Sequence, residues 1–469
     1  MGRIQEVQGL DVGCLLTSRW LVLAVLGVGF VLSGCSTLPK PDVDDDTVHL
    51  IQSQATISES DLLDVRIEVF DPGVLPTSED QARGLSMEIR QAEARYIPVE
   101  LKKAIERTGH WGAVRVVPSG SPGDEVLLTG RIVNSNGEIL ELEINAYDAT
   151  GHRWFADTYY GAVDLKMYRR AERKGWEVFQ NVYNKIANDL TRYRLKITPA
   201  QVRRIQQVAE LRFAEEMAPR VFEGYLQKVD DDKAGASGGL FSLGINPKLG
   251  TDLKDIFSGL MGSSNPKEVP KPVYRIDRLP AENDEMLQRV RRIRQRDDLL
   301  VDTLDGHYEG PYLEMQDTYA QWRTQRAKEI NMIREVEDKQ QAEVAKGVAA
   351  IAVAVLVGVV ASNSDNSSFN SGLAGASGAI AAEGVRKIFE ASEVDEEAEI
   401  NRAALEELGE SFSADVEPIV VEVEGETVEL TGTAQAKYHQ WRDVLGKLYA
   451  DETGFLPDAG EAASSAGND

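Results

Sequence analysis

The sequence predicts an α+β protein, because apolar patterns typical of strands and of helices occupy separate stretches of the chain. Apolar and polar residues alternate over residues 63–70, as in a half-buried strand. Asn136-Gly137 separates two further apolar-rich runs, and this dipeptide is a strong hairpin signal because both central residues need positive φ. Over residues 282–336, apolar residues recur mostly every three or four positions, as in helices. We therefore expect a small α/β domain with an antiparallel meander, a long helical hairpin with a small-residue segment, and a C-terminal ββα unit.

Residues 62–228 are predicted to form the α/β domain with a helical extension. The expected elements are a strand over 63–69, a helix over 98–108, strands over 114–117, 126–133, 139–147 and 154–159, and a helix with Trp176, Phe179, Tyr183, Ile186 and Leu190 on one apolar stripe. Thr198 and Gln201 have the spacing of a capping box and open another helix, which ends or kinks near Pro219.

The β-α-β-β-β-α order of residues 62–192, with its VLLTGRIV and LELEINAYDATGHRW segments, resembles the small α/β domain of curli-export lipoproteins, TolB amino-terminal domains and lipoprotein activators of peptidoglycan synthases. The resemblance rests on pattern rather than on any signature motif. It implies a domain that recognises a protein partner in the cell envelope.

Residues 229–272 are rich in Gly, Ser, Asp and Pro, and this composition predicts a linker. Residues 273–346 are predicted to form the long helical hairpin, with its turn at Asp305-Gly306 and Gly310-Pro311. A basic run, RVRRIRQR, occupies residues 289–296 of this acidic chain. We expect a solvated face paired with acidic neighbours; the alternative is a docking site for an anionic partner such as lipid headgroups or cell-wall polymer.

Residues 347–391 carry small residues at regular steps and are predicted to form a second helical hairpin. The positions expected to pack helix against helix are Gly347, Ala350, Ala354, Gly358, Gly372, Ala376 and Gly384. Residues 347–384 resemble the glycine-zipper hairpins of bacterial envelope proteins. The apolar stretch 347–361 spans only about 22 Å as a helix, which is marginal for a bilayer core of about 30 Å. A tight hairpin, self-packed or oligomeric, is favoured; insertion into a membrane is the alternative.

Residues 392–455 are predicted to form an acidic segment followed by the ββα unit. Between Glu390 and Glu429 there are fifteen acidic residues and one basic residue, which is typical of a solvated surface. Residues 416–450 resemble part of the BON module of envelope proteins, because they share its strand-Gly-strand-Gly-helix order. Residues 456–469 are predicted to be a disordered tail.

In the N-terminal region, a basic residue and an apolar run precede a cysteine. Arg19 precedes an uncharged apolar run over residues 20–32, which is too short to span a bilayer and has the length of a signal-peptide core. The small residues and the cysteine that follow are Leu32, Ser33, Gly34 and Cys35, and their order resembles the lipobox in the signal peptides of bacterial lipoproteins. The resemblance implies cleavage of residues 1–34, a covalent lipid on Cys35 as the only attached group, and a tether over residues 35–61. Ser36, where an Asp would favour the inner membrane, implies an outer-membrane location.

Composition limits the remaining possibilities. The chain carries a formal net charge of −26, which disfavours binding of nucleic acid or anionic lipid by bulk charge. Cys35 would be the only cysteine of the mature chain, so no disulfide is expected. The five histidines lack the spacing of a metal site, and the GxSxG match at residues 235–239 lacks a preceding strand pattern. We therefore expect no metal, no cofactor and no catalysis.

These observations favour a non-enzymatic assembly, scaffold or secretion-accessory factor, held to the outer membrane by lipid and acting by protein–protein interaction or self-association. Two alternatives remain open at the level of the sequence. One is a membrane-inserting oligomeric export or pore component that uses residues 347–384. The other is a cell-wall hydrolase whose two carboxylates leave no local signature.

Overall fold

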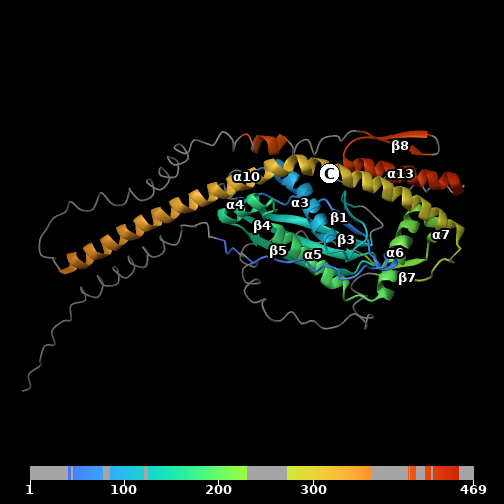
Figure 1. Cartoon of the computed structure of the whole chain (residues 1–469), viewed down its shortest axis with the longest axis horizontal. Helices are drawn as coiled ribbons and strands as arrows, with labels where there is room; N and C mark the ends of the chain where they lie inside the picture. Colours follow the sequence, from blue (N-terminus) through green and yellow to red (C-terminus); the bar gives the residue numbers. More distant parts are fainter. Residues whose placement is uncertain are drawn as a thin grey trace, which may run out of the picture. The chain divides into compact units, whose positions relative to one another are not determined.

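The sheet at the centre of the chain has five strands, β1 (Val65–Glu68), β2 (Val114–Val117), β3 (Val126–Ser135), β4 (Ile139–Asp148) and β5 (Arg153–Ala162), in the order β2-β1-β3-β4-β5 (Figure 1). β1 is parallel to β2 and β3, whereas β3, β4 and β5 form an antiparallel meander. The fold is therefore mixed α/β with the predicted meander.

The computed structural model describes residues 41–43, 46–77, 85–120, 125–229, 272–281, 283–360, 400, 402–407, 418–423 and 426–453. Several predictions lie outside these residues: the signal peptide with Leu32, Ser33, Gly34, Cys35 and Ser36, most of the 229–272 linker, the positions Gly372, Ala376 and Gly384, and the tail. Residues 41–328 and 393–469 form one compact unit, and residues 1–40 and 329–392 form the other.

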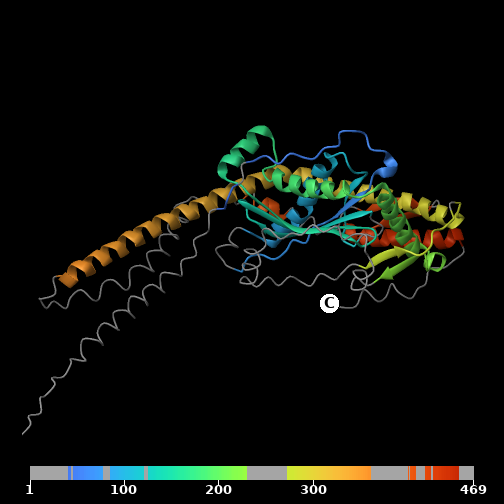
Figure 2. The ribbon, with the colours of Figure 1, turned by 90° about the horizontal axis from the view of Figure 1, so that it is seen from below.

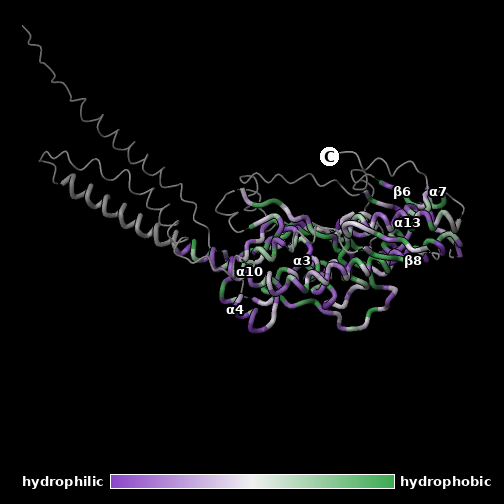
Figure 3. Tube along the Cα trace, turned by 90° about the horizontal axis from the view of Figure 1, so that it is seen from above, coloured by the Kyte–Doolittle hydropathy of each residue, from purple (hydrophilic) through white to green (hydrophobic). Residues whose placement is uncertain are grey.

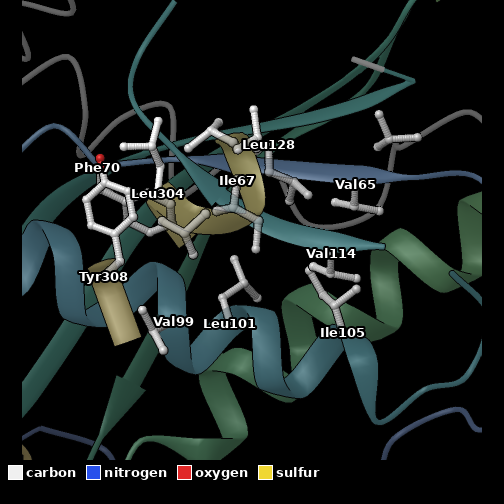
Figure 4. Packing of buried hydrophobic residues seen from close by; sticks show 14 of the residues in the cluster. Val65, Ile67, Phe70, Val99, Leu101, Ile105, Val114, Leu128, Leu304 and Tyr308 are labelled. Atoms are coloured by element: carbon white, nitrogen blue, oxygen red, sulfur yellow. The ribbon is translucent and has the colours of Figure 1, made fainter. Parts of the chain in front are cut away.

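Helices α3 (Met87–Glu106) and α5 (Gln180–Arg194) pack on the sheet and on each other (Figure 2). Val65 and Ile67 of β1 are fully buried, as are Val99, Leu101 and Ile105 of α3. Figure 4 shows these strand and helix side chains packed together. The alternation in residues 63–70 thus turns every second side chain toward α3. Arg66, which lies between Val65 and Ile67, is buried as well, so β1 is covered on both faces rather than half-buried as predicted.

α3 begins eleven residues before the predicted start at Pro98 (98 − 87), so that prediction was wrong. Ser86 caps the helix, and its side-chain oxygen accepts a hydrogen bond from the N–H of Ile89 at 3.3 Å. Pro98 has no N–H to donate to the carbonyl of Ala94. The N–H of Phe70 donates to that carbonyl instead, at 2.9 Å, and so joins the end of β1 to the helix. The carbonyl of Ala94, which Pro98 leaves without its usual helical partner, is therefore still hydrogen-bonded.

The turn between β3 and β4 lies where Asn136-Gly137 predicted it, but its geometry differs. Gly137 has φ +92°, while the side-chain Oδ1 of Asn136 accepts hydrogen bonds from the N–H groups of Glu138 and Ile139. Asn136 itself pairs with Ile139 through its N–H at 3.2 Å. Asn136 therefore closes the turn with its side chain rather than occupying one of its central positions.

α6 (Pro199–Met217) begins with the predicted capping box of Thr198 and Gln201, and α7 (Pro219–Phe222) follows directly, as Pro219 predicted. After them, β6 (Leu226–Val229) pairs in antiparallel fashion with β7 (Val273–Ile276). The strands on either side of the predicted linker are thus paired. The residues before and after this predicted linker belong to the same compact unit.

The chain from Glu285 to Val360 is one helix, α10, of 76 residues. The predicted hairpin turn at Asp305-Gly306 and Gly310-Pro311 is therefore wrong. Asp305 is buried, pairs with Lys102, and accepts a hydrogen bond at 2.7 Å from the N–H of Val116 on the edge strand β2. The buried side chains at three- and four-residue steps continue through the supposed turn: Leu304, Tyr308, Tyr312, Met315, Tyr319 and Trp322. Tertiary packing outweighs the preference of Gly and Pro for turns here.

The C-terminal ββα unit is present as β8 (Ile419–Val423), β9 (Glu426–Leu430) and α13 (Ala434–Thr453). Arg442 of α13 lies 2.6 Å from Glu216 of α6 and 3.4 Å from Asp297 of α10. Asp297 is 0% exposed and also lies 3.9 Å from Arg66 of β1. A buried charge cluster thus joins the unit to the helices beside it.

Gly347, Ala350, Ala354 and Gly358 all lie within the helical span of α10. The second arm lies outside the described residues, so the small-residue hairpin and the packing of these positions stay predictions. Among the residues that the structure describes, no helix contains a stretch that is both long and apolar enough to span a bilayer.

Candidate functional site: a cleft between α4 and α10

α4 (Leu165–Lys174) is short and sharply bounded. The side chain of Asp164 accepts hydrogen bonds from the N–H groups of Lys166 and Met167, both at 2.9 Å, and Gly175 ends the helix in the left-handed conformation. The N–H of Trp176 then donates to the carbonyl of Ala171 at 3.0 Å, which reverses the chain. This turn leaves the indole of Trp176 51% exposed. The prediction that Trp176 belongs to the buried stripe of α5 was wrong, although Phe179, Tyr183, Ile186 and Leu190 are buried as expected.

A buried ion pair fixes the loop after α4 against α10. Arg323 Nη1 lies 2.6 Å from Glu177 Oε1, and Nη2 lies 2.8 Å from Oε2. Glu177 Oε1 also accepts the N–H of Phe179 at 3.2 Å, at the start of α5, where a negative charge is favoured. Arg323 is 2% exposed. Burial lowers the pKa of Arg323, but Glu177, Tyr319 and Tyr96 together outweigh that effect and raise this pKa well above its usual value.

Aromatic rings surround this arginine. Its guanidinium carbon lies 4.2 Å from the ring centre of Tyr319 and 5.6 Å from that of Phe179. Tyr96 stacks on Tyr312, with 4.7 Å between the ring centres, and meets Tyr319 edge-on at the same separation. Charge on a phenolate would have to form in this apolar surrounding, so burial raises the pKa of Tyr96 and Tyr319 far above their usual values. The tyrosines act as packing and hydrogen-bonding groups.

The β3–β4 turn approaches α10 at the same point. A Cβ added at Gly137 would lie 2.8 Å from the carbonyl oxygen of Arg323 and 3.0 Å from Cβ of Arg326. The carbonyl of Gly137 accepts a hydrogen bond from the Tyr168 hydroxyl of α4 at 2.5 Å. Gly137 therefore allows the sheet, α4 and α10 to meet.

A second buried carboxylate, Glu93 of α3, lies behind the ion pair. Its Oε1 accepts hydrogen bonds from Ser135 at 2.5 Å and from Tyr319 at 2.7 Å, and its Oε2 lies 3.6 Å from Arg90 Nε. Burial raises the pKa of Glu93, against the opposing effects of Arg90 and these hydroxyl groups. None of the side-chain nitrogens of Arg90 has a hydrogen bond among the described residues. The geometry here fits positioning of α3 against α10 rather than proton transfer to a bound molecule.

The cleft between α4 and α10 has a volume of about 860 Å³. Its α4 side and the following loop contribute Leu165, Tyr168, Arg169, Glu172, Trp176 and Glu177. Its α10 side contributes Gln316, Asp317, Ala320, Gln321, Arg323, Thr324, Gln325 and Lys328, at successive turns of the helix. The amides of Gln316, Gln321 and Gln325 have no hydrogen bond within the described part of the chain, so they are open to a bound group.

The side chains that line the cleft can form hydrogen bonds and ion pairs with a bound molecule. The described residues that line it include neither histidine, cysteine nor serine, and its buried carboxylate, Glu177, is held by Arg323. Among the residues that the structure describes, no group of three His, Cys, Asp or Glu side chains could hold a metal ion. Side-chain amides both donate and accept hydrogen bonds, as peptide groups do.

Side-chain amides already bind main-chain groups elsewhere in the chain, on residues 46–51 of the predicted tether. Asn181, Asn184 and Asn188 lie along one face of α5 and bind this segment by its main chain. Asn181 Oδ1 accepts the N–H of Val48 at 2.9 Å, and Asn184 Nδ2 donates to the Val48 carbonyl at 2.7 Å. Asn188 Oδ1 accepts the N–H of Ile51 at 2.7 Å. The tether therefore joins the compact unit at α5.

The basic run at residues 289–296 is at least partly paired, as we expected. Arg291 forms an ion pair with Glu210, with Nη2 3.1 Å from Oε2. Val290 and Ile293 of the same run are buried. The alternative of a free anion-binding surface on this run is thus weakened. No prediction from the sequence concerned α4, although the chain has five Lys or Arg residues between Leu165 and Lys174.

Comparison of the chain with protein-family models, with curated proteins and with solved structures finds no match.

Proposed function

We propose that this chain is a lipid-anchored protein of the bacterial outer membrane that binds a partner polypeptide in the cleft between α4 and α10. In this role it is a non-enzymatic assembly, scaffold or secretion-accessory factor. The observation that carries the proposal is the cleft itself, about 860 Å³ in volume, with three unoccupied glutamine amides along α10 and an exposed indole at its rim.

A polypeptide fits this cleft better than a small apolar ligand does. Ligand pockets for small molecules are mainly apolar and enclosed, whereas this cleft is open and much of its lining is polar: Gln316, Gln321, Thr324, Gln325. Gln321 and Gln325 are four residues apart, so successive turns of α10 present amides on one face. Aromatic side chains such as Trp176 supply much of the binding energy in protein interfaces.

The walls of the cleft are fixed before a partner arrives. The Arg323–Glu177 pair holds the loop that carries Trp176, and Gly137 lets α4 and α10 meet the sheet closely. A preformed site avoids part of the entropic cost of ordering side chains on binding. This rigidity supports a specific partner rather than a passing contact.

Membrane attachment in the proposal rests on the lipobox resemblance of Leu32, Ser33, Gly34 and Cys35, and the outer membrane on Ser36. The test is labelling of cells with an alkyne-tagged fatty acid, followed by isolation of the chain. Label on the wild-type chain and none on Cys35→Ala supports the anchor. Equal label on both, or none on either, overturns it.

Partner binding is tested by placing a photo-crosslinking amino acid at Gln321 in living cells. Leu299, also on α10 and 67% exposed, is the matched control outside the cleft. We expect a discrete protein adduct from position 321 that position 299 does not give. The same adducts from both positions, or none from position 321, would refute the role of the cleft.

A further inference from the structure

α4 is a basic helix on an acidic protein. Lys166, Arg169, Arg170, Arg173 and Lys174 are all exposed, and Glu172 is the only acidic residue of the helix. Figure 3 colours this run of charged residues as hydrophilic. Lys166, Arg169 and Arg173 have no ion pair within the described part of the chain. The chain as a whole carries −26, so cations left without carboxylate partners call for an explanation outside the described fold.

The cations are concentrated on the outward face of α4. Successive residues of a helix are about 100° apart, and the buried Tyr168 and Ala171 mark the side that faces the protein. Leu165, Tyr168, Arg169 and Glu172 line the cleft with α10 on one flank. The side chains that point away from the buried side of α4 are those of Lys166, Arg170 and Arg173.

Trp176 completes this surface. Lys174 Nζ lies 4.2 Å from the centre of the indole ring, and the guanidinium carbon of Arg170 lies 5.8 Å from it. A half-exposed tryptophan beside cations combines an apolar ring with positive charge. Tryptophan with lysine and arginine is the combination that favours the headgroup layer of a membrane.

The predicted tether reaches the same place. Thr47 lines a hollow of about 270 Å³ together with Met167, Arg170 and Trp176, and Asn181 of α5 belongs to that hollow as well. Asn181 Nδ2 donates to the carbonyl of Asp46 at 2.8 Å, which holds the tether there. Cys35 precedes Asp46 by eleven residues (46 − 35), and eleven residues reach at most about 40 Å.

We propose that the outward face of α4, with Trp176 at its edge, binds the anionic phospholipid headgroups of the membrane that holds the lipid anchor. This inference rests on the anchored function proposed above. The tether leaves the compact unit beside α4, so a lipid on Cys35 would keep this face within about 40 Å of the membrane surface.

Local charge decides this interaction more than the net charge does. Salt screens charges beyond about 8 Å at physiological ionic strength, so carboxylates elsewhere on the molecule oppose the approach of α4 only weakly. Each cation close to an anionic leaflet contributes a roughly fivefold increase in partition, which corresponds to about 1 kcal/mol. Three outward cations therefore favour the bound orientation by about a hundredfold.

The test reconstitutes the lipidated full chain in vesicles and measures quenching of tryptophan fluorescence by brominated lipid. The other tryptophans in the described residues, Trp111, Trp154, Trp322 and Trp441, are buried, so quenching reports on Trp176. Trp176→Phe gives the background. Vesicles contain phosphatidylcholine alone, or phosphatidylcholine and phosphatidylglycerol in about a 2:1 ratio. We expect quenching with phosphatidylglycerol that is lost in high salt.

Two charge-reversal variants make the test specific. Lys166→Glu/Arg170→Glu/Arg173→Glu should reduce quenching to the level seen with phosphatidylcholine alone. Lys196→Glu/Arg203→Glu/Arg204→Glu changes the charge equally at exposed positions beyond the other end of α5, and should leave quenching unchanged. Flotation of each sample with its vesicles reports on the anchor separately.

Four outcomes would overturn the inference. Flotation without quenching leaves the anchor standing and removes the role of α4. Equal quenching with and without phosphatidylglycerol shows that charge is not recognised. Retention on purified peptidoglycan that the α4 reversal abolishes, with no quenching by lipid, assigns the basic face to a cell-wall polymer instead. Absence of flotation in every vesicle refutes both the anchor and the headgroup contact.

Discussion

Arg323 of α10 and Glu177 of the loop after α4 form a bidentate ion pair, with nitrogen–oxygen distances of 2.6 and 2.8 Å. Both groups are shielded from water, since their side chains are only 3% and 9% exposed. The pair therefore connects two elements that are 146 residues apart in sequence and form opposite walls of the cleft. Its loss should affect stability and the cleft together.

Arg323→Met should lower the free energy of unfolding by about 3–5 kcal/mol, because Glu177 is left as a buried charge without its partner. Glu177→Leu should be similarly harmful. The double variant Arg323→Met/Glu177→Leu should recover much of that loss, since no lone charge remains. Urea unfolding of the four chains measures this coupling. Additive effects of the two single substitutions would argue against the pair as the connection.

Gly306→Ala should stabilise the protein by up to about 1 kcal/mol, because an exposed glycine inside a helix is unfavourable and a Cβ there would meet nothing within 4 Å. Gly137→Ala should instead destabilise it, since its φ is +92° and the added Cβ would lie 2.8 Å from the Arg323 carbonyl. Thermal unfolding compares the two. Loss of stability in Gly306→Ala would favour the hairpin turn that the sequence predicted over a continuous α10.

We predict that the stability of the protein depends on pH through Glu125. Burial, with a smaller contribution from Asp64, raises the pKa of Glu125 to about 7, although the N–H of Asp64 donates to its carboxylate at 2.9 Å. The folded chain then holds a proton that the unfolded chain has lost, since the ordinary pKa is 4.5. Stability from this group is present below pH 4.5 and falls as pH rises to about 7, by at most about 3 kcal/mol.

Glu125→Gln should remove that pH dependence, because its amide keeps an oxygen for the Asp64 N–H and carries no charge. The free energy of unfolding, measured from pH 5 to pH 8, should fall less steeply in the variant than in the wild-type chain. Parallel curves for the two proteins would show that Glu125 titrates near its ordinary value.

Asn188→Leu should release one part of the tether and leave another in place. Ile51 donates its N–H to Asn188, whereas Val48 donates its N–H to Asn181. Hydrogen exchange should therefore accelerate at Ile51 much more than at Val48. Asn181→Leu is the reciprocal control and should accelerate exchange at Val48. Equal acceleration at both amides in either variant would mean that Asn181 and Asn188 do not hold Val48 and Ile51 independently.

The sequence predicted those elements that local patterns determine. The alternation in residues 63–70 led to β1, the Asn136-Gly137 pair located the β3–β4 turn, and Thr198 with Gln201 marked the start of α6. In each of these the deciding interactions lie within a few residues of one another. The ββα unit near the C-terminus was also visible, because Gly and apolar runs alternate there.

Long-range contacts decided the elements that the sequence missed. Pro98 is tolerated inside α3 because Phe70, which follows β1, donates its N–H to the free carbonyl of Ala94. Asp305 lies in a helix because Val116 and Lys102 reach it from the sheet and from α3. Neither partner can be identified from spacing along the chain. The sequence alone could not predict the cleft, because its two walls are far apart along the chain. Arg323 and Glu177 form their ion pair only after the chain has folded.

Occupation of the cleft by a partner polypeptide can be tested by filling the cleft. Ala320→Trp places an indole in it, whereas Leu313→Trp adds the same ring at a position of α10 that is 65% exposed and does not line the cleft. The measurement is the yield of the adduct formed by a photo-crosslinker at Gln321 in cells. We predict that Ala320→Trp reduces the yield at least about tenfold and that Leu313→Trp leaves it unchanged. An unchanged yield in Ala320→Trp would show that the partner polypeptide does not occupy the cleft.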